Sequence, residues 1–102
     1  MEIKSRLDKS KVFVYFSGEI DEYSSVKARQ TIDKVLESNA NFNTVIFDFS
    51  NTSFMDSTGI GMLLGRYKKL KKRGVASYIS NPSFAVNKVF QISGIYDVMP
   101  KI

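Results

Sequence analysis

The sequence contains neither cysteine nor histidine. Without cysteine the chain forms no disulfide and offers no thiolate, and its composition gives no support for secretion. Without histidine it cannot build a Ser–His–Asp triad, a Cys–His pair or an imidazole metal site. A serine that lacks such a base is a weak nucleophile. We therefore expect no catalytic residue, no metal site and no cofactor.

Long apolar runs are also missing. No stretch of 18 or more apolar residues occurs, so no membrane-spanning helix is expected. The N-terminal segment, residues 1–10, is polar and does not resemble a signal peptide. We expect a cytoplasmic protein. With 102 residues, the chain is long enough for one domain, residues 1–102, around one modest core.

Basic residues outnumber acidic ones, 15 to 10, which gives a net charge of +5. Such a balance permits an acidic partner or a nucleic acid. However, the basic residues are concentrated in residues 68–73, at the end of a predicted helix, where positive charge favours the helix dipole. Aromatic residues such as Phe13 and Phe47 fall in apolar runs that are typical of a core. We therefore expect no nucleic-acid partner.

The most informative stretch is FMDSTGIGMLLGRYK, residues 54–68. Asp56 is a favoured N-cap residue, and Gly74 after the basic run is typical of a helix end. The pattern predicts a helix that starts at Asp56 and presents Ser57 to solvent, at the positive end of the dipole. Between these ends, apolar residues recur with helical spacing at Ile60, Leu63, Leu64, Tyr67 and Leu70.

Three glycines lie inside this predicted helix: Gly59, Gly61 and Gly65. Each costs roughly 1 kcal/mol relative to alanine in a helix interior. Close packing of the helix on a sheet would account for them, and so would a partner that must approach the helix start closely. Both explanations remain open. Met62 lies off the apolar stripe, so we expect an exposed, polarisable side chain there.

The rest of the chain alternates between strand and helix patterns. Residues 2–7, with alternating apolar positions, and the continuous apolar run 12–16 resemble a hairpin, with the second strand buried on both faces or nearly so. Residues 50–55 read as a loop. The further predicted strands are residues 44–49, 75–79 and 97–99, and the further predicted helices are 24–38, capped by Ser24, and 83–92.

The third predicted helix has its own boundary signals. Pro82 fits the first helical turn, and Gly94 fits a left-handed C-terminal position. The order of elements predicts an α/β fold: a mixed, mostly parallel sheet of four to five strands with about three α-helices.

Three segments together resemble one known family. They are GEID at residues 18–21, FMDSTGIGMLLGRYK at 54–68 and FAVNKVFQISGI at 84–95. The chain resembles, over about its whole length, the anti-sigma factor antagonists, which are bacterial members of the STAS domain family. The LGRYK continuation is closest to the sporulation branch. The resemblance implies a STAS-like single domain.

The resemblance also implies a phosphorylation switch. In this family the unphosphorylated antagonist binds an anti-sigma factor, an ATP-dependent serine kinase, and so releases a sigma factor for transcription in sporulation or stress. Phosphorylation of the serine after the aspartate abolishes binding, and a serine phosphatase restores it. The matching position is Ser57, with Thr58 as a less favoured hydroxyl. A phosphate at a helix N-terminus should leave the fold nearly unchanged.

The expected partner-binding surface surrounds this serine. It comprises Glu19, Asp21, Asp56, Ser57, Thr58, Gly59, Gly61 and Met62. Family members usually continue into a further C-terminal helix, whereas this chain stops at Ile102.

Two other functions are weighed against this one. The first is a STAS interaction module of a transporter or of a stress-signalling complex, which the chain start at Met1 and the intact Ser57 disfavour. The second is an enzyme that uses the carboxylates of Asp21, Asp48 and Asp56. Neither a spaced acidic cluster nor a glycine-rich phosphate loop with its lysine supports catalysis.

Overall fold

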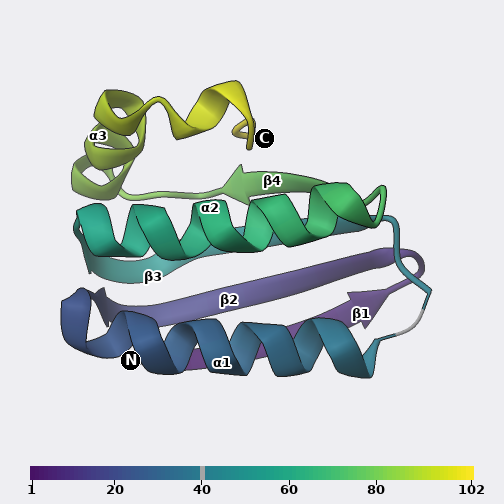
Figure 1. The fold of residues 1–102 in the computed structure, drawn as a ribbon. Helices are drawn as coiled ribbons and strands as arrows, with labels where there is room; N and C mark the ends of the chain where they lie inside the picture. Colours follow the sequence, from purple (N-terminus) through teal and green to yellow (C-terminus); the bar gives the residue numbers. More distant parts are fainter. Residues whose placement is uncertain (40) are drawn as a thin grey trace.

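A four-stranded sheet in the order β1-β2-β3-β4 forms the centre of the molecule (Figure 1). The computed structural model describes residues 1–39 and 41–102. β1 pairs with β2 antiparallel, whereas β2, β3 and β4 run parallel to one another. The strands are β1 (Glu2–Asp8), β2 (Lys11–Ile20), β3 (Thr44–Met55) and β4 (Ala76–Ser80). The helices are α1 (Glu22–Ser38), α2 (Ser57–Lys72), α3 (Phe84–Ser93) and the short 3-10 helix η1 (Ile95–Asp97).

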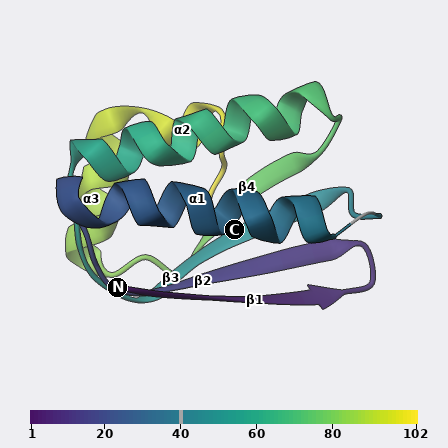
Figure 2. The same ribbon diagram turned by 60° about the horizontal axis from the view of Figure 1, so that its bottom comes forward.

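The helices α1 and α2 lie on the same face of the sheet (Figure 2). The helix α3 and the C-terminal segment lie beyond β4, at the edge opposite β1 (Figure 1). The core between sheet and helices contains the stacked rings of Phe16 and Phe49, with centroids 5.0 Å apart. Phe90 of α3 meets Phe49 edge-on at 4.9 Å, so α3 joins the same core. These observations confirm the predicted mixed, mostly parallel α/β fold.

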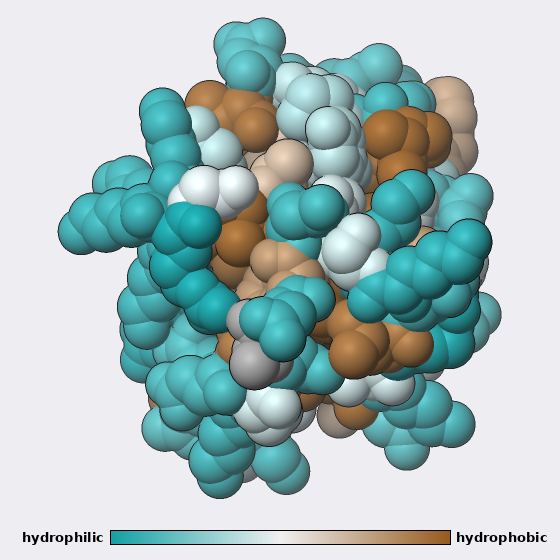
Figure 3. All heavy atoms as spheres, turned by 90° about the vertical axis from the view of Figure 1, so that its right-hand side faces the viewer, coloured by the Kyte–Doolittle hydropathy of each residue, from teal (hydrophilic) through white to brown (hydrophobic). Residues whose placement is uncertain are grey.

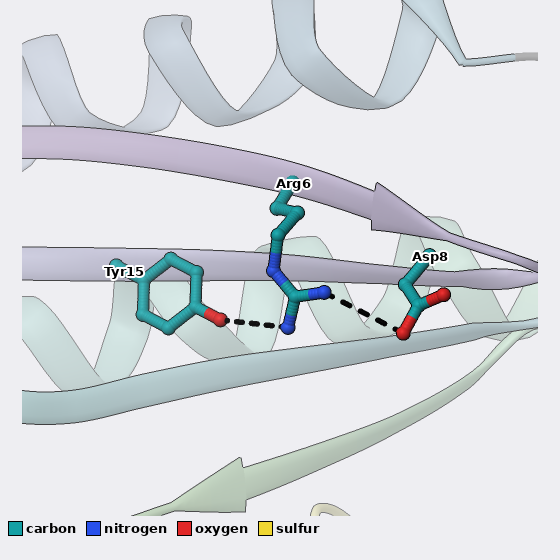
Figure 4. A network of polar contacts seen from close by, with 3 residues as sticks. All are labelled: Arg6, Asp8 and Tyr15. Carbon is teal, nitrogen blue, oxygen red and sulfur yellow. Dashed lines mark hydrogen bonds and ion pairs between the residues drawn. The ribbon is translucent and has the colours of Figure 1, made fainter.

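The other face of the sheet is partly exposed over β1 and β2. Phe13 and Tyr15 are only half-buried there, so the expectation that residues 12–16 are buried on both faces or nearly so is wrong. The Arg6 guanidinium lies 4.4 Å above the Phe13 ring, donates to the Tyr15 hydroxyl at 3.2 Å and pairs with Asp8 at 3.5 Å (Figure 4). β1 is more exposed than its alternating pattern suggested, with Leu7 at 52%.

Two strands are longer than the sequence pattern predicts. β3 continues through residues 50–55, so the predicted loop there is wrong. At two places in this pairing, opposite Tyr15–Ser17 and Gly18–Glu19 of β2, β3 has one residue more than β2, and the pairing then continues as far as Met55. Residues 50–55 therefore remain paired in the sheet, although their polar side chains are of the types that are common in loops.

Differences also occur near the C-terminus. Residues 95–97 form η1, and the predicted strand at 97–99 is wrong; in the described chain this region pairs with the sheet through a single bridge between Ile79 and Lys101. Ser83 caps α3, because its hydroxyl accepts a hydrogen bond from the Val86 N–H at 3.3 Å. Pro82 therefore precedes the cap, and its predicted place in the first helical turn is wrong. Gly94 ends α3 with φ +76°, as predicted.

Candidate functional site

The parallel pairing of β2 and β3 brings the starts of α1 and α2 together. Ile20 and Met55 are partners in the register, and each strand leads directly into a helix through an aspartate. Asp21 caps α1 and Asp56 caps α2. The sheet thus places two helix N-termini, with their carboxylates, at one end of the molecule.

Asp56 fixes the first turn of α2. Its Oδ1 accepts hydrogen bonds from the backbone N–H groups of Thr58, at 3.0 Å, and Gly59, at 3.2 Å. Its own N–H donates to the Ile20 carbonyl at 3.3 Å, which ties the cap to β2. This confirms the predicted N-cap.

Ser57 is exposed on the first residue of α2. Its hydroxyl makes no hydrogen bond within the described residues, because the cap uses the carboxylate of Asp56 instead. An exposed, unengaged hydroxyl at a helix N-terminus can accept a modifying group without disturbing the cap.

The cap of α1 differs from the one that the sequence predicts. Asp21, rather than Ser24, is the N-cap, and the two residues form a capping box with bonds of 2.9 and 3.0 Å. Hydrogen bonds to the carboxylate, chiefly from the Ser24 backbone, lower the pKa of Asp21. The Ser24 hydroxyl also donates to the Glu19 carbonyl at 3.0 Å, so Glu19 adjoins the same cap.

A shallow concavity of about 670 Å³ separates the two caps. Asp21 and Asp56 both line it, together with Tyr23 and Val26. Tyr23 is 93% exposed and Val26 51%, so two apolar groups flank a pair of carboxylates. Neither Tyr23 nor Val26 was among the contact residues predicted from the sequence. One signal was available for Val26, because it lies off the buried side of α1.

A second concavity, of about 300 Å³, lies on the other side of Ser57 and is almost wholly apolar. Ile60 of α2 and Val89 and Ile92 of α3 line it together with Ser57. Ile92 is 88% exposed. Ser57 therefore stands at the border between a carboxylate pair and an apolar surface, and Ile92 is a further candidate contact that sequence reasoning missed.

The three glycines of α2 have different surroundings. A Cβ at Gly59 would overlap the sulfur of Met55 and touch Ile20, so close packing accounts for this glycine. No atom lies within 4 Å of a Cβ built at Gly61 or Gly65. Packing within the described chain therefore does not account for Gly61 and Gly65, whereas close approach by another molecule would.

Of the eight predicted surface residues, two are buried. Met62 is 6% exposed, and the expectation of an exposed anchor there is wrong. The helical stripe identified one buried side of α2, whereas the neighbouring α1 covers a second side. Gly59 is buried as well. Ser57, Thr58, Gly61 and Glu19 are exposed, and Asp21 and Asp56 are partly so.

Asp48 lies apart from this group and links β3 to the end of β4. Its carboxylate accepts hydrogen bonds from the Ser50 hydroxyl at 2.6 Å, the Ser80 hydroxyl at 2.9 Å and the Asn81 side-chain amide at 2.7 Å. Burial acts to raise the pKa of Asp48, but these hydrogen bonds outweigh it and the pKa is lowered. Among residues 1–39 and 41–102, no group of three or more acidic residues could hold a metal ion.

The opposite end of the molecule has a different character. Hydrophilic side chains dominate the surface there, with apolar atoms in separate areas between them (Figure 3). The last turn of α2 contributes Lys69, Lys71 and Lys72. Within the described residues, none of the helices combines the length and apolarity needed to cross a membrane.

The fold and the site define a class of protein: a small α/β domain that presents a serine beside the capping carboxylate of a helix. The chain belongs to the STAS domain family, whose model matches residues 2–102. This confirms the family resemblance inferred from the sequence.

The relatives include proteins named as antagonists of anti-sigma factors. The anti-sigma F factor antagonist of Lysinibacillus sphaericus is 33% identical over 84 residues, covering 82% of this chain and 71% of the relative. The anti-sigma-B factor antagonist of Bacillus subtilis (strain 168) is 29% identical over 99 residues, covering 97% of this chain and 88% of the relative.

Solved structures show the same likeness. The unphosphorylated anti-sigma factor antagonist SpoIIAA superposes with a TM-score of 0.81 and 31% identity, covering 99% of this chain and 88% of that one. The phosphorylated form of the Bacillus protein SpoIIAA superposes with a TM-score of 0.72 and 30% identity, covering 99% and 91%.

Proposed function

We propose that this protein is an anti-sigma factor antagonist that is switched by phosphorylation of Ser57. The observation that carries the proposal is the exposed Ser57 hydroxyl directly after the N-cap Asp56, in a chain that resembles named antagonists over nearly its whole length. In this role the unphosphorylated protein binds an anti-sigma factor and thereby frees a sigma factor. The role is regulatory rather than catalytic.

The proposed docking surface combines the two concavities beside Ser57. Its centre consists of Ser57, Thr58 and the capping carboxylates of Asp21 and Asp56, with Glu19 adjacent. Exposed apolar groups lie on either side of this centre, and a docked partner would gain free energy by burying them: Tyr23 and Val26 on α1, and Ile92 on α3. Gly61 adds a stretch of α2 without a side chain, where a partner backbone can come close.

Phosphorylation would act on this surface rather than on the fold. A phosphate adds about −1.5 to −2 charges at pH 7, and a helix N-terminus favours an anion there. The same dianion would lie next to the apolar concavity of Ile60, Val89 and Ile92. A docked partner would have to desolvate it without compensation, which is costly. A loss of only ~3 kcal/mol weakens binding by about a hundredfold.

The proposed partners are an anti-sigma factor with ATP-dependent serine kinase activity and a serine phosphatase that reverses the modification. Mg²⁺ and ATP would belong to the kinase, so the antagonist itself needs no cofactor. The alternative, an interaction module of a transporter or stress complex, has less support, because the relative from Bacillus subtilis that this chain covers over 88% of its length is named an antagonist.

Incubation with a cognate anti-sigma kinase and Mg-ATP tests the proposal. Intact-mass measurement should show one added phosphoryl group on the wild type and on Thr58→Ala, and none on Ser57→Ala. Kinase binding should be retained by Ser57→Ala and lost in the phosphorylated protein. Modification of Thr58 instead, or equal binding by both forms, would contradict the assignment.

A further inference from the structure

A groove of about 350 Å³ runs between α1 and α2. Thr58 lies at one end of its lining on α2, and Arg66, two helical turns further along, lies at the other. Arg29 contributes to the groove from α1. Ser57 itself lines a different concavity, whereas its neighbour Thr58 lines this groove.

Arg66 is an unusual residue to find in such a place. It is only 5% exposed, although arginine is rarely buried without partners. Its Nε lies 3.0 Å from the Asp33 carboxylate, but not in hydrogen-bonding geometry, and its buried Nη1 finds no acceptor in residues 1–39 and 41–102. A buried guanidinium group whose donors lack acceptors is energetically costly, and an additional negative charge beside it would reduce that cost.

The neighbouring charges do not meet this need. Asp33 is shared, because Lys69 also reaches it, at 3.1 Å. Burial lowers the pKa of Arg66, Asp33 acts to raise it, and the positive charge of Arg29 lowers it further. Arg66 therefore has two further cations near it, Arg29 in the groove and Lys69 outside its lining, and only the carboxylate of Asp33 to balance them.

We propose that the groove between α1 and α2 binds an oxyanion, a phosphate or carboxylate group, through the guanidinium groups of Arg29 and Arg66. Guanidinium groups suit both ligands because their planar donors match paired oxygens. Thr58 and Gly61 line this groove and also belong to the proposed docking surface, so a bound ligand would lie next to a docked partner. The site does not require phosphorylation of Ser57, because Ser57 lines the other concavity.

The shape of the groove indicates a ligand larger than the anion itself. Gly61 and Gly65 stand one turn apart on the groove side of α2, and a Cβ at either would meet no atom within 4 Å. The absence of these side chains leaves room beside the arginines for the body of a small organic molecule. The ligand class is thus a small phosphorylated or carboxylated compound, with its anionic group at the arginine end.

Titration with inorganic phosphate and with succinate, each balanced with sodium chloride to constant ionic strength, tests the proposal and separates the two anions. Proton–nitrogen spectra would follow the arginine Nε–H signals and the amides of Gly61 and Gly65. We expect saturable shifts at Arg29, Arg66 and both glycines with at least one anion. The anion that saturates at the lower concentration identifies the preferred group.

Matched variants provide the control. Arg29 is exposed, so Arg29→Gln should fold normally and weaken binding by at least about tenfold, as expected for one lost charge-assisted hydrogen bond. Lys68→Gln removes the same charge from an exposed position of α2 outside the groove lining and should bind like the wild type. Shifts that never saturate, or equal titrations of the two variants, would overturn the proposal.

Discussion

A side chain at Gly59 would occupy the space that the sulfur of Met55 already fills. Gly59 lies in the first turn of α2 and Met55 ends β3, so this contact sets how closely the helix start approaches the sheet. The same helix contains Gly65, where a Cβ would meet open space. The two positions form a natural pair for measuring what close packing contributes.

We predict that Gly59→Ala is less stable than Gly65→Ala by about 1–3 kcal/mol. Both changes improve helix propensity, by up to ~1 kcal/mol, but only Gly59→Ala overpacks a buried contact. Urea unfolding of both variants and the wild type measures the difference. Gly65→Ala should equal or exceed the wild type; equal stability of the two variants would show that Met55 repacks freely.

The lowered pKa of Asp48 predicts a specific loss of stability in acid. A carboxyl group whose pKa is lower in the folded protein than in the unfolded chain stabilises the fold above the unfolded value, here 3.8. That contribution disappears as pH falls through the folded pKa. Denaturant unfolding from pH 6 to pH 2 should show wild type and Asp48→Asn converging below the unfolded value. A constant difference across this range would contradict the prediction.

Ile92 offers a cleaner test of the docking surface than Met62. Because Ile92 is 88% exposed, Ile92→Lys should change the free energy of unfolding by no more than about 0.5 kcal/mol. It should weaken binding to the anti-sigma factor at least tenfold, about 1.4 kcal/mol, because it places a charge where apolar area would be buried. Titration calorimetry measures the affinity.

Leu7→Lys is the matched control. Leu7 is also exposed and apolar, but it lies on β1, away from the helix starts. It should leave both affinity and stability unchanged. Met62→Lys cannot serve in the same way, since burial of Met62 means that a lysine there would disturb the fold before it altered any contact. Normal binding by Ile92→Lys would remove α3 from the proposed surface.

The elements that the sequence predicts best are those with local chemical causes. The Asp56 cap, the stripe of α2 and the left-handed Gly94 all depend on residues close in sequence. The STAS family itself was recognisable from the segment around Ser57 and its spacing to Gly18–Asp21. Such features need no knowledge of what packs against them.

The predictions that failed depend on distant neighbours. Residues 50–55 have loop-like side chains, but β2 holds them in the sheet. The burial of Met62 depends on α1, which a single helical stripe does not reveal. The relation of Ile92 to Ser57 depends on how α3 folds back beside α2, and no local pattern of residues indicates it.

The pairing of Ile20 with Met55 has a consequence for any partner that contacts both helix caps. The distance between Asp21 and Asp56 is set by strand alignment, not by loops, because each aspartate directly follows its strand. Losing one residue from β2 would move the first cap by about 3.3 Å along the sheet and turn it to the opposite side. A partner that contacts both helix starts therefore binds only when β2 and β3 keep this alignment.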